Sequence, residues 1–221
     1  HPPPRQPCGT YGRPVRRPAA ATGTVPPVDD RIASRPIGIV VNPRSGTDVR
    51  RSVAAAGSVT VEDKANVVRR VVRGAREAGA RHFMVHHDSH RIICRATETM
   101  RDVELSWIDM DLTFTEEDTV AAVAAMRAAD CAVVVVIGGD GTNRAAARAW
   151  PDLPVVPLST GTNNAFSIMV EATVAGAACG HLATGRCRLD DVARMAKVVR
   201  VTPRGADLPD DLALVDAVAV D

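Results

Sequence analysis

The chain has 221 residues, of which 46% are hydrophobic, 24% are charged and 3% are aromatic, so its core must be built from aliphatic side chains. Residues 1–35 carry six Arg and two Asp, a net charge of +4, which leaves about −3 for the remainder from a total of +1. The folded part therefore offers no general basic surface for nucleic acid, and any anion site must be local. No stretch approaches the roughly 18 apolar residues of a membrane span, so no membrane partner is predicted.

The amino-terminal segment, residues 1–35, contains eight of the fifteen prolines and shows no hydrophobic periodicity. A segment of this composition cannot bury a core, and we predict that it is disordered. A transit peptide can have a similar Arg-rich composition, but the segment contains no convincing amphipathic helix.

The first predicted strand, Pro36–Asn42, is a continuous apolar run, as expected for a strand buried on both faces of a parallel sheet. It leads into a glycine-containing loop, residues 43–48. There the guanidinium of Arg44, the hydroxyl of Ser45 and the backbone at Gly46 could bind a phosphate. An ordinary strand–helix connection is the alternative interpretation of this loop.

Strands and helices alternate over the next ninety residues. Thr60–Asp63 resembles a capping box and predicts an amphipathic helix to about Ala78. Further strands are predicted at Arg81–Val85 and Val103–Ile108, and further helices at residues 88–100 and from a cap at Thr115–Asp118 to Ala129. This alternation predicts an α/β fold with a doubly wound parallel sheet over residues 36–185.

Histidine and cysteine residues show no metal-binding spacing. The candidates are His82, His86, His87 and His90, and the cysteines Cys8, Cys94, Cys131, Cys179 and Cys187. Adjacent histidines point to opposite faces of a continuing strand, so a polar strand end is favoured over a zinc site. The cysteines are scattered, and reduced thiols in the cytoplasm are the simplest account of them.

The most informative stretch is Cys131–Thr142, an apolar strand that ends in the sequence Gly-Gly-Asp-Gly-Thr, followed by a predicted helix, Thr142–Ala149. A turn of this kind presents backbone N–H groups at a helix N-terminus, where a phosphate is favoured. The loop has no lysine and is not the common phosphate loop. A carboxylate in its middle, Asp140, would hold a metal ion such as Mg²⁺ or accept a proton from an attacking hydroxyl. A tight turn with a solvated Asp is the alternative.

A third strand with a polar loop follows at Leu153–Leu158. Six small polar residues, Ser159–Asn164, come next and could bind ribose or phosphate oxygens, and a helix-like apolar run covers residues 165–179. Loops that follow parallel strands share the carboxyl edge of the sheet, where ligands bind. The candidate nucleotide-binding residues are Asn42, Arg44, Ser45, Gly46, Gly138, Gly139, Gly141, Thr142, Ser159, Thr160, Gly161, Thr162, Asn163 and Asn164.

The carboxyl-terminal part, residues 186–221, is less clearly patterned. Residues 189–199 are compatible with a helix, residues 203–211 with a link, and Leu212–Val220 with one strand. A lone strand needs partners, so we interpret this part as a link and the first strand of a truncated second domain.

Three segments resemble the NAD kinase and diacylglycerol kinase superfamily: Gly38–Gly46, Gly138–Arg144 and Ser159–Phe166. Within it, the chain is most similar to the ATP-NAD kinase-like proteins of the AcoX type, which are encoded with acetoin-catabolism genes. The resemblance implies ATP and Mg²⁺ as cofactors, NAD or a related nucleotide as substrate, and a C-terminal β-rich domain that is largely missing here. It also implies that Asp140 is the base or metal-linked carboxylate.

Two departures from the superfamily pattern bear on the substrate. Lipid kinases continue with Asn-Asp where this chain has Asn164-Ala165, and an acidic Asn-Glu pair often occurs where this chain has Asn143-Arg144. The leading prediction is an ATP-dependent kinase of a ribose hydroxyl in a small-molecule nucleotide. The alternatives are a catalytically weak NAD(P)- or ATP-binding module and a lipid kinase, which would need an exposed apolar groove. A homo-oligomer is compatible with the sequence.

Overall fold

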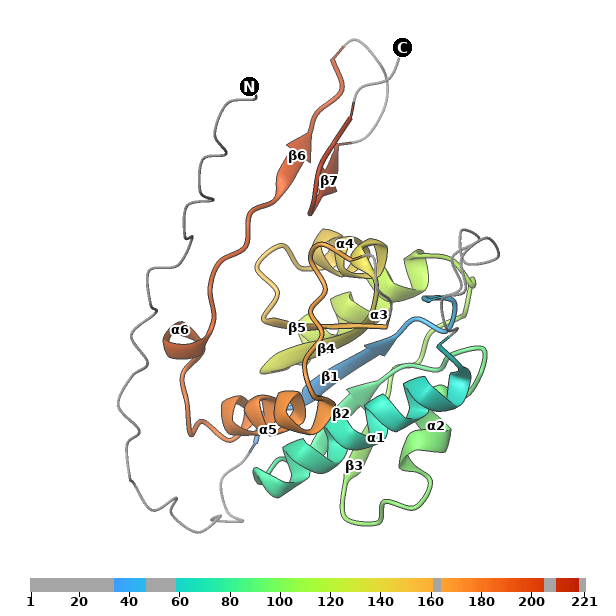
Figure 1. Ribbon diagram of the computed structural model, residues 1–221, viewed down its shortest axis with the longest axis vertical. Helices are drawn as coiled ribbons and strands as arrows, with labels where there is room; N and C mark the ends of the chain where they lie inside the picture. The colour runs from blue at the N-terminus through green and yellow to red at the C-terminus, as the bar shows by residue number, and fades with distance from the viewer. Residues whose placement is uncertain (1–33, 47–58, 161–163, 205–209, 219–221) are drawn as a thin grey trace, which may run out of the picture.

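The computed structural model describes residues 34–46, 59–160, 164–204 and 210–218 (Figure 1). Its centre is a five-stranded parallel sheet in the order β3-β2-β1-β4-β5. The strands are β1 (Ile37–Val41), β2 (His82–Val85), β3 (Glu104–Trp107), β4 (Val133–Gly138) and β5 (Val155–Ser159). The predicted α/β, doubly wound fold is confirmed. The predicted disordered segment lies, apart from its last two residues, outside the described residues.

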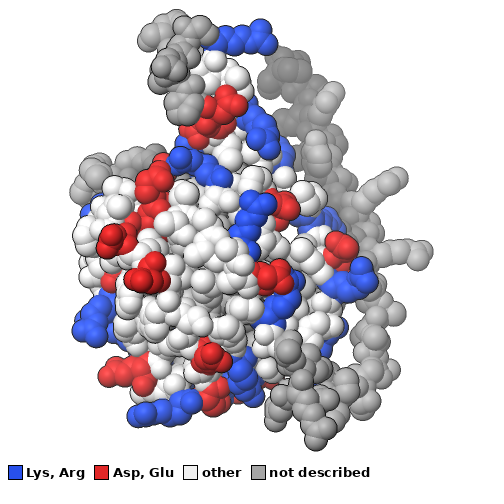
Figure 2. Space-filling model, turned by 180° about the vertical axis from the view of Figure 1, so that it is seen from behind, with Lys and Arg blue, Asp and Glu red and all other residues white. Residues whose placement is uncertain are grey.

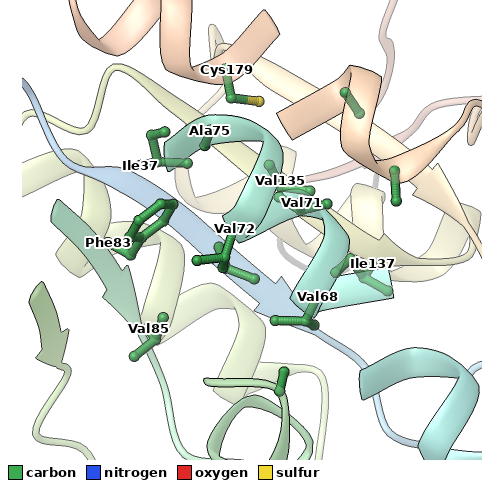
Figure 3. Packing of buried hydrophobic residues seen from close by; sticks show 14 of the residues in the cluster. Ile37, Val68, Val71, Val72, Ala75, Phe83, Val85, Val135, Ile137 and Cys179 are labelled. Carbon is green, nitrogen blue, oxygen red and sulfur yellow. The ribbon is translucent and has the colours of Figure 1, made fainter. Parts of the chain in front are cut away.

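The two central strands are apolar along their whole length because both faces of the sheet are covered. Every residue of β1 and β4 is buried. One face is covered by α1 (Val61–Glu77), α2 (Ile92–Thr97) and α5 (Ala172–Ala183), and the other by α3 (Glu117–Ala128) and α4 (Asp140–Ala149) (Figure 1). On the first face, Val68, Val71 and Val72 of α1 pack against β1, β2 and β4 (Figure 3).

Helices α1 and α5 pack closely because each has a glycine where the backbone of the other helix approaches. A Cβ atom on Gly176 would lie 2.0 Å from the carbonyl oxygen of Val71, and one on Gly74 would lie 2.0 Å from that of Thr173. Both distances are far below van der Waals contact, so the two helices can approach this closely only with glycine at both positions.

The start of α1 is the predicted capping box, whereas α3 starts differently. In α1, the Asp63 N–H donates to Thr60 Oγ1, and the Thr60 N–H donates to the Asp63 carboxylate at 2.9 Å. In α3, the Asp118 carboxylate instead accepts the N–H groups of Thr113 and Phe114 at 2.7 and 2.9 Å. The predicted cap at Thr115–Asp118 is confirmed in part, because Thr115 Oγ1 accepts the Glu117 N–H at 3.2 Å, while the Asp118 carboxylate reaches back to residues 113 and 114.

Three predicted helices are shorter than their sequence pattern suggested, and the first of them, predicted over residues 88–100, forms only as α2 (Ile92–Thr97). Residues 165–171 are not helical: Ile168 continues the sheet by pairing with Leu158 of the edge strand β5, and α5 begins only at Ala172. Between 189 and 199, only α6 (Leu189–Val192) is helical, and the chain then extends to β6 (Val199–Val201). Side-chain pattern alone did not reveal these competing strand contacts.

The carboxyl-terminal strand has a partner. β6 pairs antiparallel with β7 (Asp211–Ala213) as a two-stranded ribbon, which projects from the domain beside α4 (Figure 1). Strand β7 is shorter than the predicted strand 212–220, since residues 214–218 are not in a strand. The division of the chain at residue 186 stays a prediction.

The surface carries charges of both signs. On the face opposite to that of Figure 1, acidic and basic side chains are interspersed around a broad uncharged area (Figure 2). Among the residues with a described placement, no helix is both long enough and apolar enough to cross a membrane.

Candidate functional site

The candidate site lies where the order of successive strands in the sheet reverses. Successive strands run outward from β1 to β3 on one side and from β4 to β5 on the other, so the switch point lies between β1 and β4. Ligands of open α/β sheets bind outside the carboxyl ends of the strands at this point. The residues that follow β1 and β4 are Asn42 and Gly139, which begin two of the three polar loops.

The three loops meet at this edge and are joined by side-chain hydrogen bonds. Asn42 Nδ2 donates to Thr142 Oγ1 at 2.9 Å, which links the first loop to the second. Thr160 Oγ1 donates to Ser45 Oγ at 2.8 Å, which links the third loop to the first. Because β4 and β5 are parallel and Gly138 pairs with Ser159, the second and third loops leave the sheet side by side.

Asn42 also organises its own turn. The Arg44 N–H donates to Asn42 Oδ1 at 2.9 Å, and Ser45 donates to the Asn42 carbonyl oxygen through its N–H at 3.3 Å and through its hydroxyl at 2.8 Å. Gly46 follows with a φ of 80°, a conformation that favours glycine. Asn42 therefore both shapes the first loop and links it to the glycine loop.

The N-terminus of α4 is free of side-chain caps in the described structure. The helix begins at Asp140, two residues earlier than predicted, and its N-cap is Gly139, which has no side chain to cap it. The N–H groups of Thr142 and Asn143 donate to the Gly139 carbonyl, whereas the first two N–H groups of a helix have no partner within it. Gly141 is exposed, and a Cβ atom there would have no protein atom within 4 Å. A helix N-terminus with exposed backbone and no side chain over it is suited to binding an anion.

The carboxylate of Asp140 is engaged by backbone. It accepts the N–H of Ala165 at 2.7 Å, of Phe166 at 3.0 Å and of Ser167 at 3.1 Å. Partial burial disfavours the charged form, but these donors outweigh it and lower the pKa of the Asp140 carboxyl below its ordinary value. Asp140 thus holds the segment after the third loop against the start of α4, a role that the sequence did not suggest.

The role of Asp140 as a metal ligand stays a prediction. Its two oxygens already accept three N–H donors. Within the described ranges, no three His, Cys, Asp or Glu side chains gather in a way that could hold a metal ion. Of the carboxylate oxygens, Oδ2 accepts only the Ala165 N–H among the described residues, so Asp140 keeps acceptor capacity for a single contact to Mg²⁺ carried on a nucleotide.

The remaining predicted residues are placed only in part. Asn164 Nδ2 donates to Ser159 Oγ at 2.7 Å, and Asn164 Oδ1 would lie 3.0 Å from a Cβ on Gly139. The third loop therefore packs on the glycine loop at this point. Three of the predicted residues, Gly161, Thr162 and Asn163, lie outside the described residues.

Arg144 anchors the carboxyl-terminal ribbon. Its Nε donates to the Leu212 carbonyl at 2.8 Å, and its guanidinium pairs with Asp211 and, at 3.2 Å, with Glu116. The arginine that replaces the expected acidic residue therefore fastens β7 to α4 and α3. Its departure from the superfamily pattern has a structural explanation.

The four histidines have separate partners. His82 Nε2 lies 2.7 Å from Ser106 Oγ, His87 stacks on Trp107 with ring centroids 4.4 Å apart, and His90 contacts Ser89. His86 is buried, its Nε2 accepts the Val41 N–H at 3.3 Å, and its Nδ1 lies 2.8 Å from the His87 carbonyl oxygen. These contacts require His86 to be neutral, with its proton on Nδ1.

We expect His86 to make the protein less stable in mild acid. Burial lowers the pKa of His86 below 6.5, although the His87 carbonyl and the charges of Asp88 and Asp118 partly oppose this. Below pH 6.5 the unfolded chain then binds more protons than the folded protein, so the free energy of unfolding falls from that pH downward. Urea unfolding at about pH 7.5 and about pH 5.5 measures the fall, which His86→Gln should reduce. Equal falls in His86→Gln and in the exposed-residue control His90→Gln would contradict the assignment.

Sequence reasoning missed two buried polar residues next to the site. Asn143 Nδ2 donates to the Gly139 carbonyl at 3.1 Å and to Ser167 Oγ at 2.9 Å. Lys64 is 1% exposed and donates to the carbonyl oxygens of Asn42 and Pro43. A signal for Lys64 was present, because it lies four residues before Val68 on the apolar side of α1, where a lysine is out of place.

Two of the comparisons with known proteins found a match. A family model described as the ATP-NAD kinase N-terminal domain matches residues 37–186. Acetoin catabolism protein X of Cupriavidus necator is 34% identical over 192 residues, which make up 82% of this chain and 54% of that protein, so the chain spans about half the length of this relative. No solved structure matches significantly. The family match covers more than half of the chain, and the chain therefore belongs to the ATP-NAD kinase family.

Proposed function

We propose that the protein binds ATP at the carboxyl edge of β1 and β4 and transfers its γ-phosphoryl group to a hydroxyl of NAD or a related nucleotide. The observation that carries this proposal is the uncapped N-terminus of α4, which lies at the switch point of the sheet beside two hydrogen-bonded polar loops. Membership of the ATP-NAD kinase family supports the choice of ATP and NAD.

The chemistry requires little of the protein beyond positioning and charge. The acceptor oxygen forms a bond to the γ-phosphorus, the bond from that phosphorus to the β-phosphate oxygen breaks, and ADP leaves. The proton of the acceptor hydroxyl goes to Asp140 or to the transferred phosphate. Backbone N–H groups at the start of α4 and the hydroxyl of Thr142 would bind phosphate oxygens, and Mg²⁺ carried on the nucleotide would neutralise their charge.

A coupled assay tests the proposal directly. The protein is incubated with ATP, Mg²⁺ and NAD, and the formation of NADP is followed with an NADP-specific dehydrogenase. Diacylglycerol in micelles is a second acceptor to test, since Ile168 and Met169 beside the site are 50% and 82% exposed. ATP-dependent NADP formation supports the proposal, and phosphorylation of the lipid alone would replace NAD as the acceptor.

Gly141→Ala tests whether Gly141 is needed for the fold or for the close approach of a ligand to its backbone. The added methyl group meets no protein atom, so the free energy of unfolding should be unchanged or rise by up to about 1 kcal/mol through higher helix propensity. If phosphate approaches this backbone, the affinity for ATP should fall about tenfold or more, as measured by isothermal titration calorimetry. Unchanged ATP affinity would move the phosphate site away from the N-terminus of α4.

A binding module without chemistry is the second candidate, and one observation favours it. The Asp140 carboxylate is occupied by three backbone N–H groups and has a lowered pKa, which makes it a weak base. ATP binding in calorimetry without NADP formation in the coupled assay would support this candidate. Both measurements on the same preparation therefore distinguish the two.

A further inference from the structure

The first loop of the site is hydrogen-bonded to a buried lysine, which forms no ion pair in the described part of the chain. Lys64 is 1% exposed, and its Nζ donates to the carbonyl oxygens of Asn42 and Pro43 at 3.1 and 2.5 Å. The negative charge of Asp88 acts on Lys64 through space, without a direct contact between the two side chains among the described hydrogen bonds and ion pairs. Asp88 itself accepts the N–H groups of Ile92 and Ile93 at 3.0 and 3.3 Å.

This placement of Lys64 is costly for the fold. An unpaired buried ammonium loses its hydration, and Lys64 also lies near the start of α1, where the helix dipole disfavours a positive charge. The same burial lowers the pKa of Lys64 to about 8. The group nevertheless stays mainly protonated at neutral pH.

The residue type also fits the place. The chain contains 25 Arg and only 2 Lys, Lys64 and Lys197, so lysine is the rare choice for a positive charge in this protein. A compact ammonium with three donors on a flexible stem can reach two carbonyl oxygens from below a tight turn, whereas the planar guanidinium of Arg is larger and suits flat, bidentate partners.

The contacts of Lys64 lead directly to the three loops. The Asn42 carbonyl that it binds also accepts from Ser45, whose hydroxyl accepts from Thr160, and the Asn42 side chain donates to Thr142. The glycine loop contains no lysine of its own. We propose that Lys64 is a positioning residue that holds the Asn42–Ser45 turn from beneath and supplies positive charge to the phosphate end of the bound nucleotide.

This inference rests on the proposed function, and Lys64→Met tests it. Methionine keeps most of the buried stem and removes the desolvated charge, a gain that offsets the loss of the two hydrogen bonds to the Asn42 and Pro43 carbonyl oxygens. We expect a melting temperature within a few degrees of the unmodified protein, together with an affinity for ATP that is about tenfold lower. The affinity for adenosine, which has no phosphate, should change by less than about twofold, because the charge acts on phosphate.

A matched control and a second variant make the result decisive. Lys197→Met removes the other lysine, which is exposed between α6 and β6, and should leave both affinities unchanged. If Lys64→Met does not fold, Lys64→Gln removes the same charge and keeps an amide group with two N–H donors. If Lys64→Met lowers the affinities for ATP and adenosine equally, or leaves the affinity for ATP unchanged, the role of Lys64 is overturned while the proposed function is not. Failure of the unmodified protein to bind ATP would overturn the proposed function and this inference with it.

Discussion

Asp140→Asn is expected to lower turnover by roughly 10²–10⁴-fold, the usual contribution of a positioned acid–base group. The substitution removes the acidic side chain in the first turn of α4 and also changes the hydrogen bonds of residue 140. Asparagine can keep its oxygen toward Phe166 and Ser167, but its amide nitrogen then faces the N–H of Ala165, where the carboxylate now accepts a bond of 2.7 Å. One lost hydrogen bond should cost about 1 kcal/mol of unfolding free energy.

Asp118→Asn is the matched control for this experiment. Asp118 also accepts two backbone N–H groups, from Thr113 and Phe114, but it lies at the start of α3 and outside the proposed site. Both variants should lose similar stability in urea unfolding, and only Asp140→Asn should lose turnover in the coupled assay. Turnover within a few-fold of the unmodified protein, with the fold intact, would remove Asp140 from the mechanism and favour the binding module.

Gly176→Ala is expected to destabilise the fold by about 3 kcal/mol or more. The methyl group would lie 2.0 Å from the carbonyl oxygen and 2.8 Å from the carbonyl carbon of Val71, both of them backbone atoms of α1 that no side-chain rotation can move. Helix α1 would have to shift away from α5, and its buried valines would lose their packing against the sheet. The higher helix propensity of alanine, about 1 kcal/mol, is too small to offset this.

Gly141→Ala is the control for this effect, because it makes the same exchange in a helix where the new methyl group meets no atom within 4 Å. Urea and thermal unfolding of the two variants should therefore differ by about 3 kcal/mol or more. A Gly176→Ala protein within about 1 kcal/mol of the unmodified one would show that α1 and α5 can separate at little cost. The close packing seen here would then not be a requirement of the fold.

The sequence by itself determined the framework of this protein. The apolar runs that became β1 and β4 could only be strands covered on both faces, and the regular alternation with helices required a parallel sheet. Parallel connectivity then brought the loops after Val41, Gly138 and Ser159 to one edge without any knowledge of side-chain contacts. The capping box at Thr60 was likewise readable, because its partners are three residues apart.

Only the tertiary structure decided how the polar residues of the site are used. Asp140 reaches three N–H groups 25 to 27 residues away, which prevents residues 165–167 from forming the predicted helix. Lys64 reaches the Asn42 carbonyl 22 residues away, and Arg144 reaches Leu212 68 residues away. Hydrophobic periodicity reports which face of an element is buried, but hydrogen bonds between distant loops depend on where the fold places their backbone, and a local pattern contains no record of that.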